Sequence, residues 1–105
     1  MRQETTRGQL DLLVLSVLTG GPLHGYGIVS ELRRRSGADL DLAEGTLYPA
    51  LHRLEREGLL SSAWSEDAPR RRRVYRLTAS GREALDGRRK EWLRFAAAVG
   101  RVVEA

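Results

Sequence analysis

The stretch AEGTLYPALHRLEREGLL, residues 43–60, decides the fold because it joins a buried helical face to an outward face suited to a ligand. Leu47, Leu51 and Leu54 recur at helical spacing, which predicts that they face a core. The outward positions hold small, hydroxyl, aromatic and basic side chains. They are Gly45, Thr46, Tyr48, Pro49, His52, Arg53 and Arg56. Such side chains suit a DNA groove and its phosphates, so this helix is predicted to contact DNA.

The two ends of this helix carry different signals. Asp41, with Glu44 three residues later, predicts a capping box at the start, and Gly58 predicts the end. Pro49 has no N–H to bond the carbonyl of Gly45, so a bend or an irregular first turn is expected.

Composition limits the class of protein. The 105 residues suit one domain, and the lack of cysteine excludes disulfides and thiolate metal sites. We expect a cytoplasmic protein without membrane association, because no apolar run is long enough for a membrane span or a signal peptide. The net charge is +4, and Lys90 is the single lysine among 18 basic residues. Arginine favours bidentate contacts with phosphate and guanine.

Two further helices are predicted before the central one. The first spans about residues 6–19 and is apolar nearly all round, since Leu12 and Leu15 lie opposite its main stripe. Such a helix is either central to the fold or shared with a second subunit. The second lies in HGYGIVSELRRRSG, residues 24–37, with Tyr26, Ile28 and Leu32 among its candidates for burial.

A β-hairpin is predicted after the central helix. LLSSAW, residues 59–64, and RRVYRL, residues 72–77, alternate as strands do, and SEDAPRR between them forms the loop. Three helices and a hairpin make a mainly α fold with a small β-hairpin, a winged helix-turn-helix, although the pattern alone also admits other arrangements. Arg70 to Arg73 and Arg76 place five charges over seven residues of this wing, which favours contact with DNA.

The last predicted helix is longer than a domain of this size can cover. Thr78 is its expected N-cap, and residues 79–103 would extend nearly 40 Å at about 1.5 Å per residue. Its apolar stripe includes Leu85, Trp92 and Val99. A second copy of the chain is expected to cover that stripe, so residues 1–78 are assigned to DNA binding and residues 79–105 to dimerisation. A twofold dimer predicts an inverted-repeat operator.

Four segments together resemble the PadR family of regulators. They are GQLDLLVLSVL, PLHGYGIVSELRRRSG, LAEGTLYPALHRLEREGLL and RRRRVYRLTASGREAL, which cover about residues 7–85. The resemblance implies a dimeric winged-helix repressor, of the short subfamily with one C-terminal helix, whose third helix enters the major groove. It also implies that Tyr26 contacts phosphate and that paired Trp92 side chains sandwich flat aromatic effectors, as in small multidrug-sensing members. Ala43 departs from the serine frequent in the family, and the wing tip lacks the usual glycine.

These considerations assign three sets of residues. The predicted DNA contacts are Tyr26, Thr46, Tyr48, Pro49, Arg53, Arg72 and Arg73. The predicted effector contact is Trp92, and the predicted dimer contacts are Leu12, Leu15, Leu85, Phe95 and Val99. Alternatives remain open: Tyr48 and Trp92 are also compatible with packing roles, and Arg53 and Arg56 with ion pairs to Glu57 and Glu55.

No enzymatic activity, metal or cofactor is expected. His24 and His52 lack a third ligand nearby, and no nucleophile–base pair or glycine-rich phosphate loop is present. His24 is expected to form a local hydrogen bond at a helix start. The alternative to a DNA-binding regulator is a winged-helix module that binds a protein partner without specific DNA binding.

Overall fold

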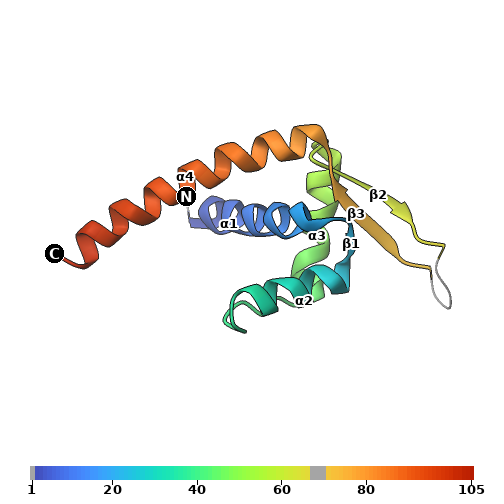
Figure 1. The fold of residues 1–105 in the computed structure, drawn as a ribbon, viewed down its shortest axis with the longest axis horizontal. Coiled ribbons are helices and arrows are strands. Elements are labelled where there is room, and N and C mark those ends of the chain that lie inside the picture. The colour runs from blue at the N-terminus through green and yellow to red at the C-terminus, as the bar shows by residue number, and fades with distance from the viewer. Residues whose placement is uncertain (1, 67–70) are drawn as a thin grey trace.

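The structure of the protein is a computed structural model that describes residues 2–66 and 71–105, with side chains from residue 8 onward. The elements are α1 (Arg2–Val17), the 3-10 turn η1 (Leu18–Gly20), β1 (Leu23–His24), α2 (Gly25–Arg35), α3 (Glu44–Arg56), β2 (Leu60–Trp64), β3 (Arg73–Leu77) and α4 (Ala79–Val103). This order of helices, hairpin wing and long final helix, drawn in Figure 1, confirms the predicted fold class. The predicted wing contact Arg70 lies outside the described residues.

The core lies where α1, α2 and α3 meet the sheet. Leu47, Leu51 and Leu54 are fully buried there, which confirms the prediction for the inner face of α3. Leu15 is also fully buried and Leu85 is buried, both within the core of this chain. Their burial corrects their assignment to a dimer surface, since a side chain enclosed by its own subunit leaves little area for another.

The sheet has three antiparallel strands in the order β1-β3-β2. The hairpin strands β2 and β3 were predicted, whereas the two residues of β1 were not. In β1, Leu23 pairs with Tyr75 and His24 pairs with Val74. This short strand places the start of α2 directly beside the wing.

Local capping explains where the helices begin and end. The N-cap of α3 is Ala43, and no side chain caps it. The predicted capping box is therefore wrong, and Asp41 instead lies 3.8 Å from the guanidinium of Arg33. At the other end Gly58 has φ 80°, a left-handed conformation that favours glycine and ends the helix as predicted. Pro49 lies within α3, which runs through it without a break.

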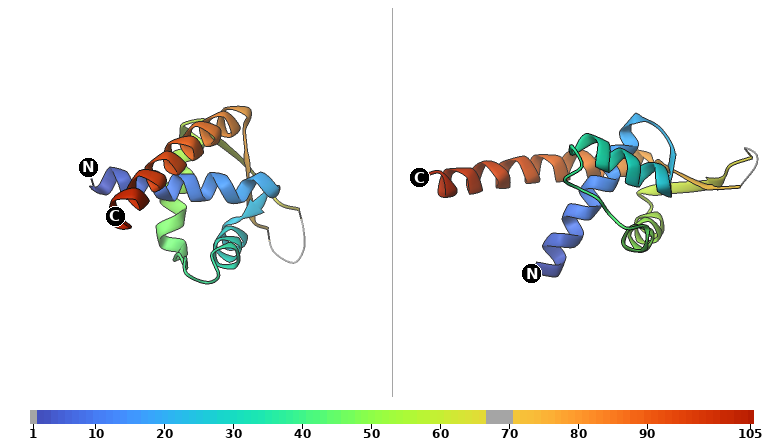
Figure 2. Two further views of the ribbon diagram at one scale, coloured as in Figure 1. Left: turned by 60° about the vertical axis from the view of Figure 1, so that its left-hand side comes forward. Right: turned by 90° about the horizontal axis from the view of Figure 1, so that it is seen from below.

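The long helix α4 begins as predicted and extends past the rest of the molecule. The hydroxyl of Thr78 accepts a hydrogen bond from the N–H of Gly81 at 3.0 Å, which caps the helix. Its C-terminal half stands clear of the other described elements (Figures 1 and 2). The described helices include none that is both long and apolar enough to cross a membrane.

Candidate nucleic-acid interface

A groove of about 570 Å³ lies between the start of α2, the start of α3 and the wing. Four of the predicted DNA contacts line it: Tyr26, Tyr48, Arg72 and Arg73. Arg71, which belongs to the predicted arginine run of the wing, also lines the groove. The lining residues that were not predicted as contacts include His24, Glu44, His52 and Trp64. Residues that are distant in sequence therefore share one polar and aromatic surface.

His24 links two sides of this groove. Its Nδ1 accepts a hydrogen bond from the N–H of Gly27 at 3.0 Å, which confirms the predicted local bond and caps α2. Its Nε2 lies 2.8 Å from a guanidinium nitrogen of Arg72 on the wing. Tyr26 stacks beside the imidazole with a centroid distance of 6.4 Å. The Tyr26 side chain is 63% exposed, so it is a surface residue and not the core residue that its helical spacing suggested.

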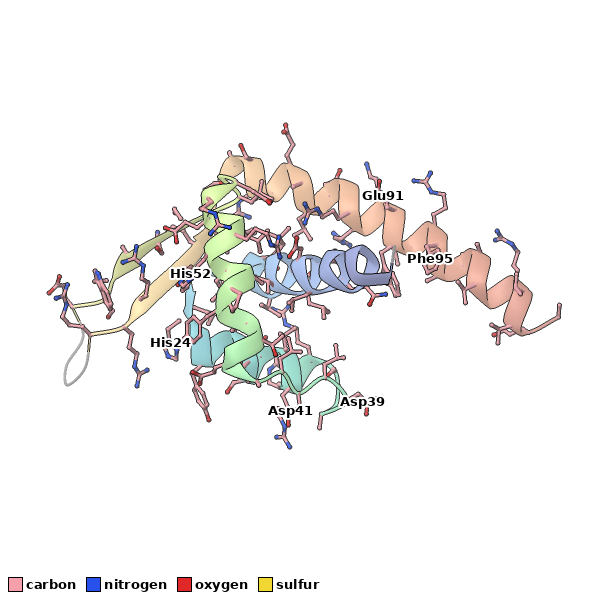
Figure 3. All side chains as sticks on the ribbon, turned by 180° about the vertical axis from the view of Figure 1, so that it is seen from behind. His24, Asp39, Asp41, His52, Glu91 and Phe95 are labelled. Carbon is pink, nitrogen blue, oxygen red and sulfur yellow. The ribbon has the colours of Figure 1, made fainter. Side chains whose placement is uncertain are left out.

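The outer face of α3 is open to solvent. Thr46 and Pro49, both predicted as contacts, are exposed there. His52 and Arg56 are exposed on the same helix but were left out of the predicted contacts. Figure 3 shows His24 and His52 on the side of the molecule that faces the wing. The helical spacing of residues 49, 52 and 56 would have identified this row.

Tyr48 is less exposed than predicted. Its half-buried ring packs against the hydrophobic core, and its centroid lies 6.4 Å from that of His52. Gly25 leaves the space for it, because a Cβ at that position would lie 2.5 Å from the Tyr48 hydroxyl oxygen. Tyr48 nevertheless lines the groove, so it combines packing with a place on the candidate surface.

Arg53 does not belong to this surface. Its guanidinium donates two hydrogen bonds to the carboxylate of Asp11, at 2.9 and 2.7 Å, and its side chain is only 14% exposed. The hydrogen bond to Asp11 raises the pKa of Arg53 above its usual value. The prediction that Arg53 contacts DNA is corrected, because the cation is already paired inside the molecule.

The wing arginines differ in how many contacts each makes within the chain. Arg73 donates a hydrogen bond to the hydroxyl of Ser62 at 2.9 Å, and Ser62 donates one to Glu55 at 2.7 Å. Arg71 and Arg73 both lie over the Trp64 ring, at 5.1 and 5.3 Å from its centroid. Arg73 is thus held against the wing and α3. Arg72, whose guanidinium contacts the His24 ring, is the better placed of the two predicted contacts for an external anion.

Burial also perturbs one phenol at the base of the groove. Tyr75 is buried, and this burial, with a smaller contribution from the nearby Glu55 carboxylate, raises the pKa of its hydroxyl. Both effects disfavour the phenolate. Tyr75 is therefore a neutral hydroxyl at physiological pH.

The predicted effector residue and most of the predicted dimer residues lie away from this groove, on α4. Trp92 is 40% exposed and packs beside Phe95, with ring centroids 6.1 Å apart. Phe95 is 56% exposed and Val99 is also exposed, whereas Leu12 on α1 is half-buried. The distal half of α4 thus carries a row of apolar side chains that this chain leaves uncovered.

Several known proteins resemble this chain. The transcriptional regulator PadR-like family matches residues 14–87. Transcriptional regulator Rv3488 of Mycobacterium tuberculosis (strain ATCC 25618 / H37Rv) is 41% identical over 83 residues, which cover 79% of this chain and 75% of that protein.

Solved structures agree with this match. A PadR family transcriptional regulator from Eggerthella lenta DSM 2243 has a TM-score of 0.82 and 35% identity, covering 100% of this chain and 90% of that chain. Bacillus subtilis PadR, solved in complex with operator DNA, has a TM-score of 0.67 and 28% identity, covering 80% of this chain and 46% of that chain. With its family match over residues 14–87 and this winged-helix fold, the chain belongs to the PadR-like family of transcriptional regulators.

Proposed function

We propose that this protein is a homodimeric, sequence-specific DNA-binding repressor whose groove between α2, α3 and the wing holds the DNA backbone. The observation that carries the proposal is the approach of His24 and Arg72 at 2.8 Å beside the exposed Tyr26. Nδ1 of His24 accepts from the Gly27 N–H, so the proton of the neutral ring is on Nε2. Both nitrogens are then donors, and they lie too close together for an acceptor to fit between them. A phosphate oxygen that drew the two side chains apart would accept a hydrogen bond from each.

The outer face of α3 would then enter the major groove. Thr46, Pro49 and His52 are exposed along it, and Gly45 adds no side chain at its start. Small residues permit a close approach, while a hydroxyl and an imidazole can form hydrogen bonds with base edges. The operator complex of Bacillus subtilis PadR supports this assignment by family and fold.

The test of this proposal is the salt dependence of DNA binding. Arg72→Gln is expected to reduce affinity for operator and random DNA alike, and to lower the slope of log affinity against log salt by about one, because one phosphate contact is lost. Fluorescence anisotropy at several salt concentrations measures the slope. Arg101→Gln, which removes an equal charge from the exposed end of α4, is the control and should leave the slope nearly unchanged. Equal slopes for wild type and Arg72→Gln would contradict the phosphate site.

The proposed dimer uses the uncovered part of α4. Trp92, Phe95 and Val99 are exposed, and they continue the stripe that begins at the buried Leu85. A second copy would bury this stripe against the same stripe of its own α4 or against its α1, where Leu12 is half-buried. A twofold arrangement would place two α3 helices about 34 Å apart, matching an inverted repeat.

The proposed effector is a planar aromatic molecule that stacks on Trp92. Its ring is 40% exposed beside Phe95, so aromatic surface is available for stacking near the proposed dimer axis. Stacking and burial of apolar area need few hydrogen bonds, so such a site would accept varied ligands. A ligand would relieve repression only by favouring the dimer geometry that fits DNA less well.

A fluorescence titration tests the effector site. In Trp64→Phe, which leaves Trp92 as the only tryptophan, a cationic acridine dye is expected to quench the emission as it stacks. Trp92→Ala should weaken dye binding at least about tenfold, a loss of about 1.4 kcal/mol. If Trp92→Ala binds the dye as tightly as wild type, as judged by dye polarisation, Trp92 is a packing residue only.

A further inference from the structure

Two arginines, from two different helices, meet at one carboxylate of a third helix inside the molecule. Asp11 on α1 is buried and accepts two hydrogen bonds from Arg53 on α3. The same oxygen that accepts at 2.9 Å from Arg53 accepts a third bond, at 3.3 Å, from Arg88 on α4. Asp11 thus links the helix proposed to enter DNA with the helix proposed to form the dimer.

The arrangement makes Asp11 dependent on its partners. A buried carboxylate loses its hydration, and ion pairs with hydrogen bonds must compensate for that loss. Glu57 lies 3.9 Å from Arg53, so two carboxylates and two guanidinium groups form a nearly neutral cluster. The bidentate geometry of Arg53 restricts how α3 can turn relative to α1.

The two arginines hold Asp11 with different strength. Arg53 forms two short bonds and is 14% exposed, whereas Arg88 forms one longer bond and is 33% exposed. The hydrogen bond between Arg88 and Asp11 can therefore break while Asp11 stays paired with Arg53. This weaker bond from Arg88 is the contact between α4 and the cluster that can change.

The two arginines lie next to the two surfaces that the proposed function uses. Arg88 precedes Trp92 by four residues, so both side chains lie on the same face of α4. Arg53 directly follows His52 on α3 and precedes Arg56 by three residues, and both of those neighbours are exposed. The Asp11 cluster therefore lies between the part of α4 that carries Trp92 and the part of α3 that carries His52 and Arg56.

We propose that Asp11 and Arg88 are positioning residues for α3, and that the arrangement of α4 is transmitted to the DNA-contacting face through Arg88, Asp11 and Arg53. This inference rests on the proposed DNA-binding function. Neither Asp11 nor Arg88 lines the groove, so their effect on DNA binding would act through Arg53. Their loss should reduce specific recognition, which needs α3 in one orientation, more than non-specific attraction to phosphates.

The experiment compares Arg88→Gln with Arg89→Gln. Arg89 is exposed on the same helix, and no ion pair is seen for it among the described residues, so its replacement removes an equal charge without touching the cluster. The DNA probes are the tightest duplex that the wild type selects from a random pool and an unselected duplex of equal length. Arg88→Gln is expected to lose about 5- to 10-fold in affinity for the selected duplex beyond the loss in Arg89→Gln, with equal losses on the unselected one. Arg88→Lys should restore part of the specific affinity.

A double-mutant cycle tests whether the effect passes through the cluster. In an Asp11→Asn/Arg53→Gln background, which removes both buried charges together, Arg88→Gln should cause no further loss. If Arg88→Gln and Arg89→Gln bind the selected duplex equally, or if the Arg88 effect persists in that background, the inference is overturned.

A measurement without DNA separates this inference from the proposed function. Hydrogen exchange of the α3 amides should be faster in Arg88→Gln than in wild type or Arg89→Gln, with urea midpoints that differ little. Failure of the wild type to select any duplex would contradict the proposed function. Unchanged exchange in α3 would by itself contradict the positioning role.

Discussion

Gly81→Ala is expected to destabilise the fold by about 3 kcal/mol or more, a large fraction of the stability of a domain of this size. A Cβ at residue 81 would overlap the carbonyl oxygen of Leu59 and would also lie 3.2 Å from a Leu77 methyl carbon. The obstacle is backbone, so no side-chain rotation relieves it. The Leu59 carbonyl also accepts the N–H of Thr78 at 3.2 Å, which fixes its position.

Gly87→Ala is the matched control for this prediction. It lies six residues further along α4, and nothing lies within 4 Å of the Cβ that it would gain. In open helix, alanine is favoured over glycine by about 1 kcal/mol, so Gly87→Ala should raise the midpoint of urea unfolding while Gly81→Ala lowers it. A Gly81→Ala midpoint within error of wild type would mean that the junction between α4 and β2 is loose.

The same junction explains how the wing and α4 are held together. The Thr78 hydroxyl donates to the carbonyl of Gly58 at 2.7 Å and accepts from the N–H of Gly81. One side chain therefore ties the turn after α3 to the start of α4. The wing, the helix proposed to contact DNA and the helix proposed to form the dimer diverge from this point (Figure 1), so a loosened junction should also impair DNA binding.

Periodic features were predictable from the sequence. The spacing of Leu47, Leu51 and Leu54 identified the buried face of α3, and Thr78 located the start of α4 at the residue observed. Both signals are local, because helical spacing and N-capping depend on residues within one or two turns. Strand alternation likewise predicted the hairpin of the wing, and the family resemblance added a DNA-contacting role for Tyr26, which lines the groove together with Tyr48.

Features that depend on distant partners were not predictable. Arg53 was expected to contact DNA because helical spacing places its charge off the leucine face. Spacing does not reveal that its partner is Asp11, which lies 42 residues earlier. Leu85 was expected in a dimer because a helical stripe does not reveal which part of it the chain covers itself. The strand β1 has two residues, too few for any alternation to be visible.

The dimer is predicted to fail when a carboxylate enters the uncovered face of α4. Phe95→Asp should convert a dimer into a monomer at micromolar concentration and weaken operator binding by more than about 100-fold. A twofold interface would contain the new charge twice, and each unpaired buried ion costs several kcal/mol, where about 1.4 kcal/mol is tenfold. Because Phe95 is 56% exposed in the single chain, the fold of each subunit should survive, as circular dichroism would show.

Ala97→Asp supplies the control for this last prediction. Ala97 is exposed two residues further along α4, so the substitution adds the same charge about 200° around the helix from Phe95. Sedimentation should find Ala97→Asp dimeric and bound to operator, and Phe95→Asp monomeric and unbound. A dimeric Phe95→Asp would place the subunit contact elsewhere on the molecule. A monomeric Phe95→Asp that still binds an inverted repeat with wild-type affinity would show that each winged helix reads its half-site alone, which removes the reason for a twofold operator.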